Sequence, residues 1–192
     1  MKKLAILLTL PLAACIRFGA EPPPSLLTLS PATPVPVGAA ANSGQARNIT
    51  IRVPSTPQEI AVTRVPVRST DTNIAYVKDA QWVEPPARLF ARLLSDTVTA
   101  RSGYVVLSGR QSNVDPGAQL TGELRNFGLD AITSTAVVTF DASLLRKDAT
   151  TFDKRRFEAR VPVSAIDATN AATGLNQAAN QVATEVADWV GR

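Results

Sequence analysis

The amino-acid sequence predicts an α+β domain, in which an antiparallel β-sheet with a three-strand meander carries two amphipathic helices on one face. Two stretches place apolar side chains at helical spacing, near residues 84–101 and 168–190. Between them, three strand-like runs at 119–129, 131–145 and 151–163 are joined by short turns, which favours an antiparallel meander. Helices gathered on one face of such a sheet form a two-layer sandwich.

The N-terminal segment, residues 1–14, predicts a signal peptide. Two lysines precede an apolar run, Leu4–Leu10, that is too short to cross a bilayer. The segment ends in Leu-Ala-Ala-Cys, which resembles a bacterial lipobox, with cleavage between Ala14 and Cys15. A buried thiol that follows an apolar run by chance is the less favoured alternative, because three independent features would have to coincide. We therefore expect Cys15 to be acylated and to become the first mature residue.

The residues after the cysteine predict where the protein is held. In Gram-negative lipoproteins an aspartate at the next position usually causes retention in the inner membrane, and this sequence has Ile16 there. We therefore expect attachment to the periplasmic face of the outer membrane, with an anchor made permanent by more than one acyl chain. Residues 15–24 contain three consecutive prolines and predict an extended tether, and residues 25–192 predict one periplasmic domain.

The composition excludes several functional classes. Lys2 and Lys3 supply half of the formal net charge of +4, so the mature chain is nearly balanced and is a poor candidate for nucleic-acid binding. The sequence has no histidine and one cysteine, which excludes Ser-His-Asp, Cys-His and Cys/His metal sites. We therefore expect neither an enzyme nor a bound cofactor. With its single cysteine acylated, the chain forms no internal disulfide, and its folding depends on core burial.

Four short strands are expected before the first helix, at 25–30, 48–53, 60–67 and 73–78. A loop rich in proline and alanine, residues 31–44, separates the first two. In the second, Ile49, Ile51 and Val53 alternate with polar residues, which is typical of a half-buried strand. In the third, Pro66 has no amide proton to donate, so we expect an edge strand or a bulge there.

Both predicted helices have recognisable ends. The first begins near Glu84-Pro85-Pro86, because proline is tolerated in a first turn and a carboxylate complements the helix dipole there, and it ends near Arg101 before Gly103. A short strand at 104–107 follows. The second helix carries Trp189 on its apolar stripe. Ser164 and Asp167 precede it, and we expect them to cap its first turn.

Two groups of residues are candidates for binding. A basic cluster surrounds the last meander turn and consists of Arg146, Lys147, Lys154, Arg155 and Arg156. It could face anionic head groups or an acidic partner, although a solvated hairpin tip is the favoured interpretation. Tyr76 and Trp82 flank the first helix, where interface and core roles are equally compatible with the sequence. Four nearby carboxylates are expected to lie on a solvated sheet face: Asp141, Asp148, Asp153 and Glu158.

The strand 49–53, the segment Tyr76–Trp82 leading through Val83-Glu84-Pro85-Pro86 into a helix, the meander and the closing helix together resemble a known family. This family is the ABC-type transport auxiliary lipoproteins, similar to paraquat-inducible protein C, which are outer-membrane-anchored partners of mammalian-cell-entry (MCE) domain lipid transporters. The resemblance covers roughly residues 25–190, together with the lipobox.

The resemblance implies a non-enzymatic subunit that docks on, or completes, a conduit moving phospholipid or other hydrophobic molecules between the two membranes. An ATPase at the inner membrane would supply the energy, an MCE-domain protein would be the periplasmic partner, and self-association into a ring stays open. A second class also stays open: an envelope lipoprotein with a structural or assembly role and no lipid handling. An exposed apolar patch larger than a few hundred Å² beyond the lipid anchor would favour binding of a partner or of lipid over a purely passive anchor.

Overall fold

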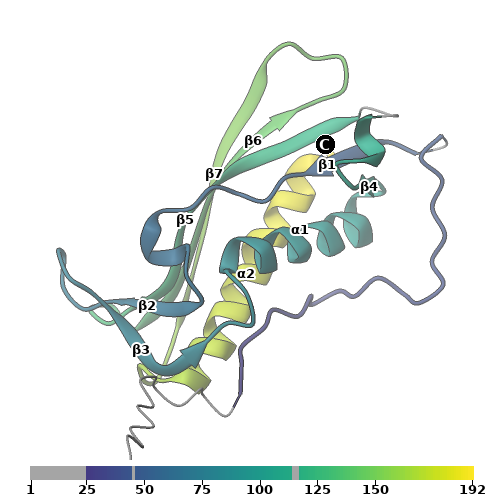
Figure 1. Ribbon diagram of the computed structural model, residues 1–192. Helices are drawn as coiled ribbons and strands as arrows, with labels where there is room; N and C mark the ends of the chain where they lie inside the picture. Colours follow the sequence, from purple (N-terminus) through teal and green to yellow (C-terminus); the bar gives the residue numbers. More distant parts are fainter. Residues whose placement is uncertain (1–24, 45, 114–116) are drawn as a thin grey trace, which may run out of the picture.

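Three long antiparallel strands, β5, β6 and β7, form the largest part of a seven-stranded sheet, and α1 and α2 lie on one side of it (Figure 1). The computed structural model describes residues 25–44, 46–113 and 117–192. The strands are β1 (Asn48–Ile51), β2 (Arg64–Arg68), β3 (Ile74–Gln81), β4 (Val105–Leu107), β5 (Ala118–Asp130), β6 (Thr135–Leu145) and β7 (Phe152–Pro162). The helices are α1 (Pro86–Ser102) and α2 (Ala168–Gly191), with short 3-10 turns η1 (Gln58–Ile60) and η2 (Gln111–Asn113). The α+β class and the meander are confirmed.

The sheet is mixed, so the prediction of a purely antiparallel sheet is wrong. One side of β5 pairs with β6 along its whole length. The other side accepts two short strands in parallel, β1 near the start of β5 and β2 at its end, where Val67 lies opposite Leu129. With 13 residues, β5 is long enough to pair with both. Whether a strand runs parallel or antiparallel depends on these distant pairings, and the alternation of apolar residues does not predict them.

Three details of the early strands differ from expectation. No strand forms at 25–30, because only Leu27 pairs with the sheet, through a bridge to Trp82. The strand at β1 is confirmed but is not half-buried: it lies between β4 and β5, so Thr50 is as inaccessible as Ile49. The bulge near Pro66 is confirmed in the pairing of β2 with β3, although the edge strand is β3 and not β2.

The core lies between the helices and the covered face of the sheet. Helix α2 packs against β5, β6 and β7, and α1 packs mainly against α2. Aromatic rings from both layers meet edge to face: the ring centres of Trp82 and Phe127 are 5.4 Å apart, and those of Phe90 and Phe140 are 5.3 Å apart. Such contacts add to the hydrophobic gain of burying these large side chains.

The ends of the helices follow their sequence signals. Gly103 ends α1 with a φ of 69°, a left-handed conformation that favours glycine. Asp167 caps α2 by accepting a hydrogen bond of 2.8 Å from the backbone amide of Asn170, as predicted. Ser164 is not a cap, because its hydroxyl donates to the side chain of Asn170 at 2.9 Å. No helix in the described ranges is long and apolar enough to span a membrane.

Candidate functional site

The β6–β7 hairpin carries the predicted basic cluster and reaches beyond the ends of the helices (Figure 1). Its strands pair in continuous register from Thr135 opposite Pro162 to Leu145 opposite Phe152, so the turn between them continues a regular two-stranded ribbon. Lys147 and Lys154 are exposed, and within the described part of the chain neither side chain forms an ion pair or a hydrogen bond. Two cations of the cluster therefore face solvent and are available to a partner.

The remaining three cations of the cluster have contacts within the domain. The Arg146 guanidinium lies 3.3 Å from the Asp153 carboxylate and donates to the backbone carbonyl of Val190 at 3.4 Å. It thereby connects the hairpin to the last turn of α2. The Arg155 guanidinium lies 4.9 Å from the ring centre of Phe157, a cation–π distance that fixes its orientation.

Arg156 belongs to the uncovered face, by which we mean the face of β5, β6 and β7 opposite the helices. Its Nε and Nη2 atoms donate to both oxygens of Asp141, at 2.6 and 2.7 Å. Arg125 approaches the same carboxylate at 3.6 Å. The hydrogen bonds from Arg156, helped by the charge of Arg125, outweigh burial and lower the pKa of Asp141. Bidentate pairing of this kind holds the guanidinium plane in one orientation.

Cross-strand polar contacts continue along the same face. Asn126 donates to the Thr139 hydroxyl at 3.2 Å, and this hydroxyl donates to Glu158 at 2.8 Å. Arg160 Nε donates to the other Glu158 oxygen at 2.8 Å. Burial raises the pKa of Glu158, but the hydrogen bonds from Thr139 and Arg160 outweigh it and lower the pKa overall. Directly opposed polar pairs stabilise the sheet, and here they give it a charged, ordered outer surface.

Asp130 is the most buried acid on this face, with a side chain only 5 % exposed. It pairs with Arg68 at the end of β2 and accepts backbone hydrogen bonds from Ile132 at 3.0 Å and Thr133 at 3.1 Å. Burial raises its pKa, but these hydrogen bonds outweigh burial, so the pKa of Asp130 lies below its ordinary value. A hollow of about 120 Å³ lies beside Arg68 and Asp130, and Ile60, Pro66 and Val137 help to line it.

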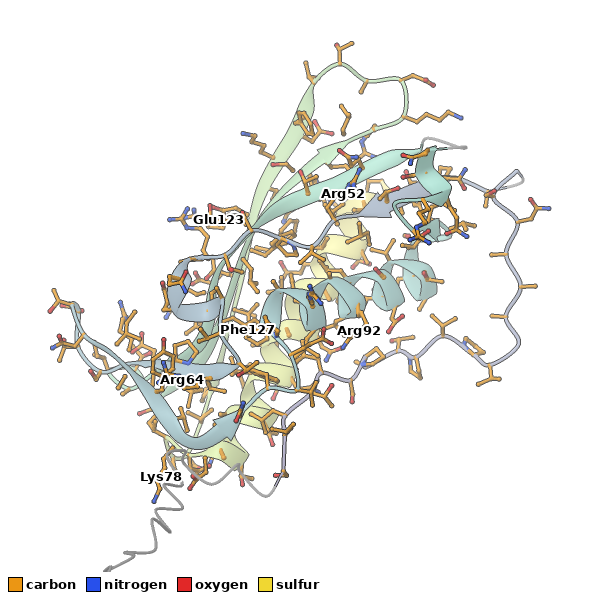
Figure 2. The ribbon with its side chains drawn as sticks, viewed as in Figure 1. Arg52, Arg64, Lys78, Arg92, Glu123 and Phe127 are labelled. Atoms are coloured by element: carbon orange, nitrogen blue, oxygen red, sulfur yellow. The ribbon has the colours of Figure 1, made fainter. Side chains whose placement is uncertain are left out.

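Figure 2 shows how the two faces of β5 differ. Phe127 points between the sheet and the helices, whereas Glu123 lies on the opposite side of the strand. The bulge between Leu124 and Asn126 keeps the aromatic side chain on the covered face while the polar residues stay outside. The sequence identified Asp141 and Glu158 as sheet-face charges but missed Arg68, Asp130 and Arg160, since their association requires the distant pairing of β2 with β5.

The two aromatic candidates for binding, Tyr76 and Trp82, differ in their burial. Trp82 is 1 % exposed and belongs to the core, so it offers no surface to a partner. Tyr76 is partly exposed on β3, and the Arg64 guanidinium lies 3.7 Å from its ring centre. Trp189, predicted to be in the core, is half-buried and packs against Phe157 at 5.6 Å.

The predicted lipidation site, Ala14 and Cys15, lies outside the described residues. Within those residues, no group of three or more metal-binding side chains comes together. The candidate site is therefore a surface: the exposed lysines of the β6–β7 hairpin tip and the adjoining ion pairs of the uncovered face.

Known proteins with a similar sequence or a similar structure share this fold. The model of the ABC-type transport auxiliary lipoprotein component family matches residues 27–187. The chain is similar to the crystal structure of protein XCC0632 from Xanthomonas campestris, of the family DUF330, with 22% identity, a TM-score of 0.67, and coverage of 88% of this chain and 92% of that one. It is also similar to an uncharacterized protein, with 16% identity, a TM-score of 0.65, and coverage of 75% and 92%. No curated protein matches.

Proposed function

Because this chain belongs to the ABC-type transport auxiliary lipoprotein component family, we propose that it is a lipid-anchored periplasmic subunit of a transport system with an MCE-domain partner. The cargo in this proposal is phospholipid or another hydrophobic molecule that moves between the inner and outer membranes. The family is one of auxiliary transport components and not of enzymes. Attachment through Cys15 to the outer membrane is part of the proposal.

The basic hairpin tip is the observation that carries this proposal. It presents the side chains of Lys147 and Lys154, which have no partner among the described residues, on a protruding hairpin, and this suits docking against an acidic surface. The hollow at Asp130 has about 120 Å³, and a wider hollow of about 640 Å³ beside Ser30 and Asn180 is an open depression on the surface of the domain. A role in contacting the conduit is therefore better supported than a role in enclosing the lipid.

A binding measurement tests the proposal directly. The full-length mature lipoprotein is purified in detergent, and its affinity for the periplasmic part of an MCE-domain protein from the same cell is measured by surface plasmon resonance. The double variant Lys147→Glu/Lys154→Glu reverses two charges that have no intramolecular partner, so its folding stability should change little. We expect an affinity about tenfold lower and a weaker dependence on salt.

A matched control separates the hairpin from net charge. Arg88→Glu/Arg110→Glu makes the same charge change at two exposed arginines elsewhere on the domain and should bind as tightly as wild type. Equal losses in both double variants would mean that only net charge matters. If the wild-type lipoprotein does not bind any MCE-domain protein of its cell, the transport proposal fails and a structural or assembly lipoprotein remains.

A further inference from the structure

Three loops meet at the end of the domain opposite the hairpin tip, and we call this region the loop end. It comprises the β2–β3 turn (69–73), the β5–β6 turn (131–134) and the segment before α2 (163–167). The amide of Ala131 donates to the carbonyl of Arg68 at 2.9 Å, and the amide of Val163 donates to the carbonyl of Ser134 at 2.9 Å. These hydrogen bonds hold the three loops next to one another.

The loop end exposes isoleucine side chains. Ile74, the first residue of β3, is 52 % exposed, Ile132 is 53 % exposed, and Ile166 is 39 % exposed. The described ranges also expose five other large apolar side chains that lie outside these loops: Leu26, Val37, Val53, Val83 and Phe152. Single exposed apolar residues are common on protein surfaces. Here, however, Ile132 and Ile166 lie in two neighbouring loops and Ile74 directly follows the third, and the other residues of these loops are mostly serine, threonine and asparagine.

The path of residues 25–32, which we call the N-terminal strap, leads to the same end. The amide of Ser30 donates to the Asn176 side chain at 2.9 Å, and the amide of Ala32 donates to the Asn180 side chain at 2.7 Å. The strap thus follows α2 in the direction of the helix. Followed backwards from Ser30, it runs toward the first turn of α2, which directly succeeds the segment 163–167.

The length of the preceding chain limits how far the domain can lie from its anchor. Leu27 is fixed to the sheet by its bridge to Trp82, with hydrogen bonds of 2.7 Å to Gln81 and 2.9 Å from Val83. Twelve peptide units separate Cys15 from Leu27, so a fully extended chain spans about 40 Å. The strap leads toward the loop end, so a tether of this length allows the loop end to reach the bilayer.

We propose that the loop end is a second membrane contact, in which Ile74, Ile132 and Ile166 enter the boundary between head groups and acyl chains. This inference rests on the proposed acylation of Cys15, which supplies the high local concentration. Isoleucine side chains lose unfavourable water contact there, while the surrounding serine and threonine hydroxyls stay hydrogen-bonded among the head groups. The loops contain few charges, so little desolvation opposes the contact.

This contact would fix the orientation of the domain. The 11 residues of β6 separate the loop end from the hairpin tip by about 36 Å. With the isoleucines in the bilayer, the exposed Lys147 and Lys154 point away from the anchoring membrane. The basic hairpin then faces a periplasmic partner and not the head groups of its own membrane.

Fluorescence at single positions tests the contact. Ile132→Cys, Ile166→Cys and Lys147→Cys are introduced into the full lipoprotein, in which acylation blocks the Cys15 thiol, and are labelled with an environment-sensitive fluorophore. Each protein is reconstituted into vesicles of phosphatidylethanolamine and phosphatidylglycerol that contain a spin-labelled quencher lipid. We expect a blue-shifted emission and several-fold stronger quenching at 132 and 166, with a water-like signal at 147.

The outcomes separate this inference from the proposed function. A water-like signal at 132 and 166 in protein that floats with the vesicles overturns the second contact and leaves the anchor intact. Equal quenching at all three positions also overturns it, because the domain would then have no fixed orientation. Protein that does not float with the vesicles, and whose mass lacks acyl chains, overturns the anchor and this inference together.

Discussion

Replacing Trp82 with alanine tests the assignment of this residue to the core. The side chain is 1 % exposed and meets the Phe127 ring at 5.4 Å. Truncating a buried tryptophan costs about 3–5 kcal/mol through lost burial and the remaining cavity. For a urea m-value near 2 kcal/mol/M, the unfolding midpoint should fall by about 2 M. Far-UV circular dichroism of the full mature chain during urea titration measures this shift.

Two controls define what the Trp82 result means. Trp82→Phe should lose less than half as much as the alanine variant, because it keeps an aromatic ring and removes a buried Nε1–H that has no hydrogen-bond partner. Trp189→Ala should also lose less, since Trp189 is only half-buried. A loss below about 1 kcal/mol in Trp82→Ala, within the range of surface substitutions, would refute the core assignment. Weaker binding to a partner at unchanged stability would instead indicate an interface.

Four further perturbations have expected outcomes. Asp130→Asn should lower the unfolding free energy at neutral pH by about 1–2 kcal/mol, because Arg68 is half exposed. The lowered pKa of Asp130 stabilises the fold above the unfolded value near 3.9, and this stabilisation is lost as the pH falls further. Urea midpoints measured from neutral pH into acid should therefore fall, and less steeply in Asp130→Asn; identical acid profiles would contradict the pairing. Asp167→Ala should lower the melting temperature measured by calorimetry, whereas Asp167→Ser should nearly preserve it. Gly103→Ala should cost about 1–2 kcal/mol in chemical denaturation, because alanine is strained at the left-handed φ of 69°, and an unchanged stability would contradict that conformation. Cys15→Ser should move the protein from the membrane fraction to the soluble periplasmic fraction on fractionation, and unchanged membrane association would count against acylation.

Most elements were predictable because their signals are local. The helix stop at Gly103 and the cap at Asp167 depend on backbone conformation within one turn, and the meander depends on alternation and short turns. The strand predicted at 25–30 is wrong, because alternating residues do not show whether a partner strand is available. Its backbone instead binds the side chains of Asn176 and Asn180, about 150 residues away in sequence.

The candidate surface was predictable only in part. The basic cluster was visible as adjacent residues, but the sequence did not show that Arg146 and Arg156 are paired while Lys147 and Lys154 are not. Arg68 and Asp130 meet because β2 pairs in parallel with the end of β5. This ion pair could not be predicted from the sequence, because it joins two strands that lie far apart in the chain.

By itself, the sequence determined both helices, the meander, the cap at Asp167, the stop at Gly103 and the resemblance to a family of auxiliary lipoproteins. The tertiary structure decided the mixed direction of the sheet, the burial of Trp82 and the separation of the hairpin tip from the loop end. The physical reason is the range of the interactions. Backbone preferences and apolar periodicity act over a few residues, whereas strand direction, side-chain burial and ion pairing are fixed only when distant segments share one core.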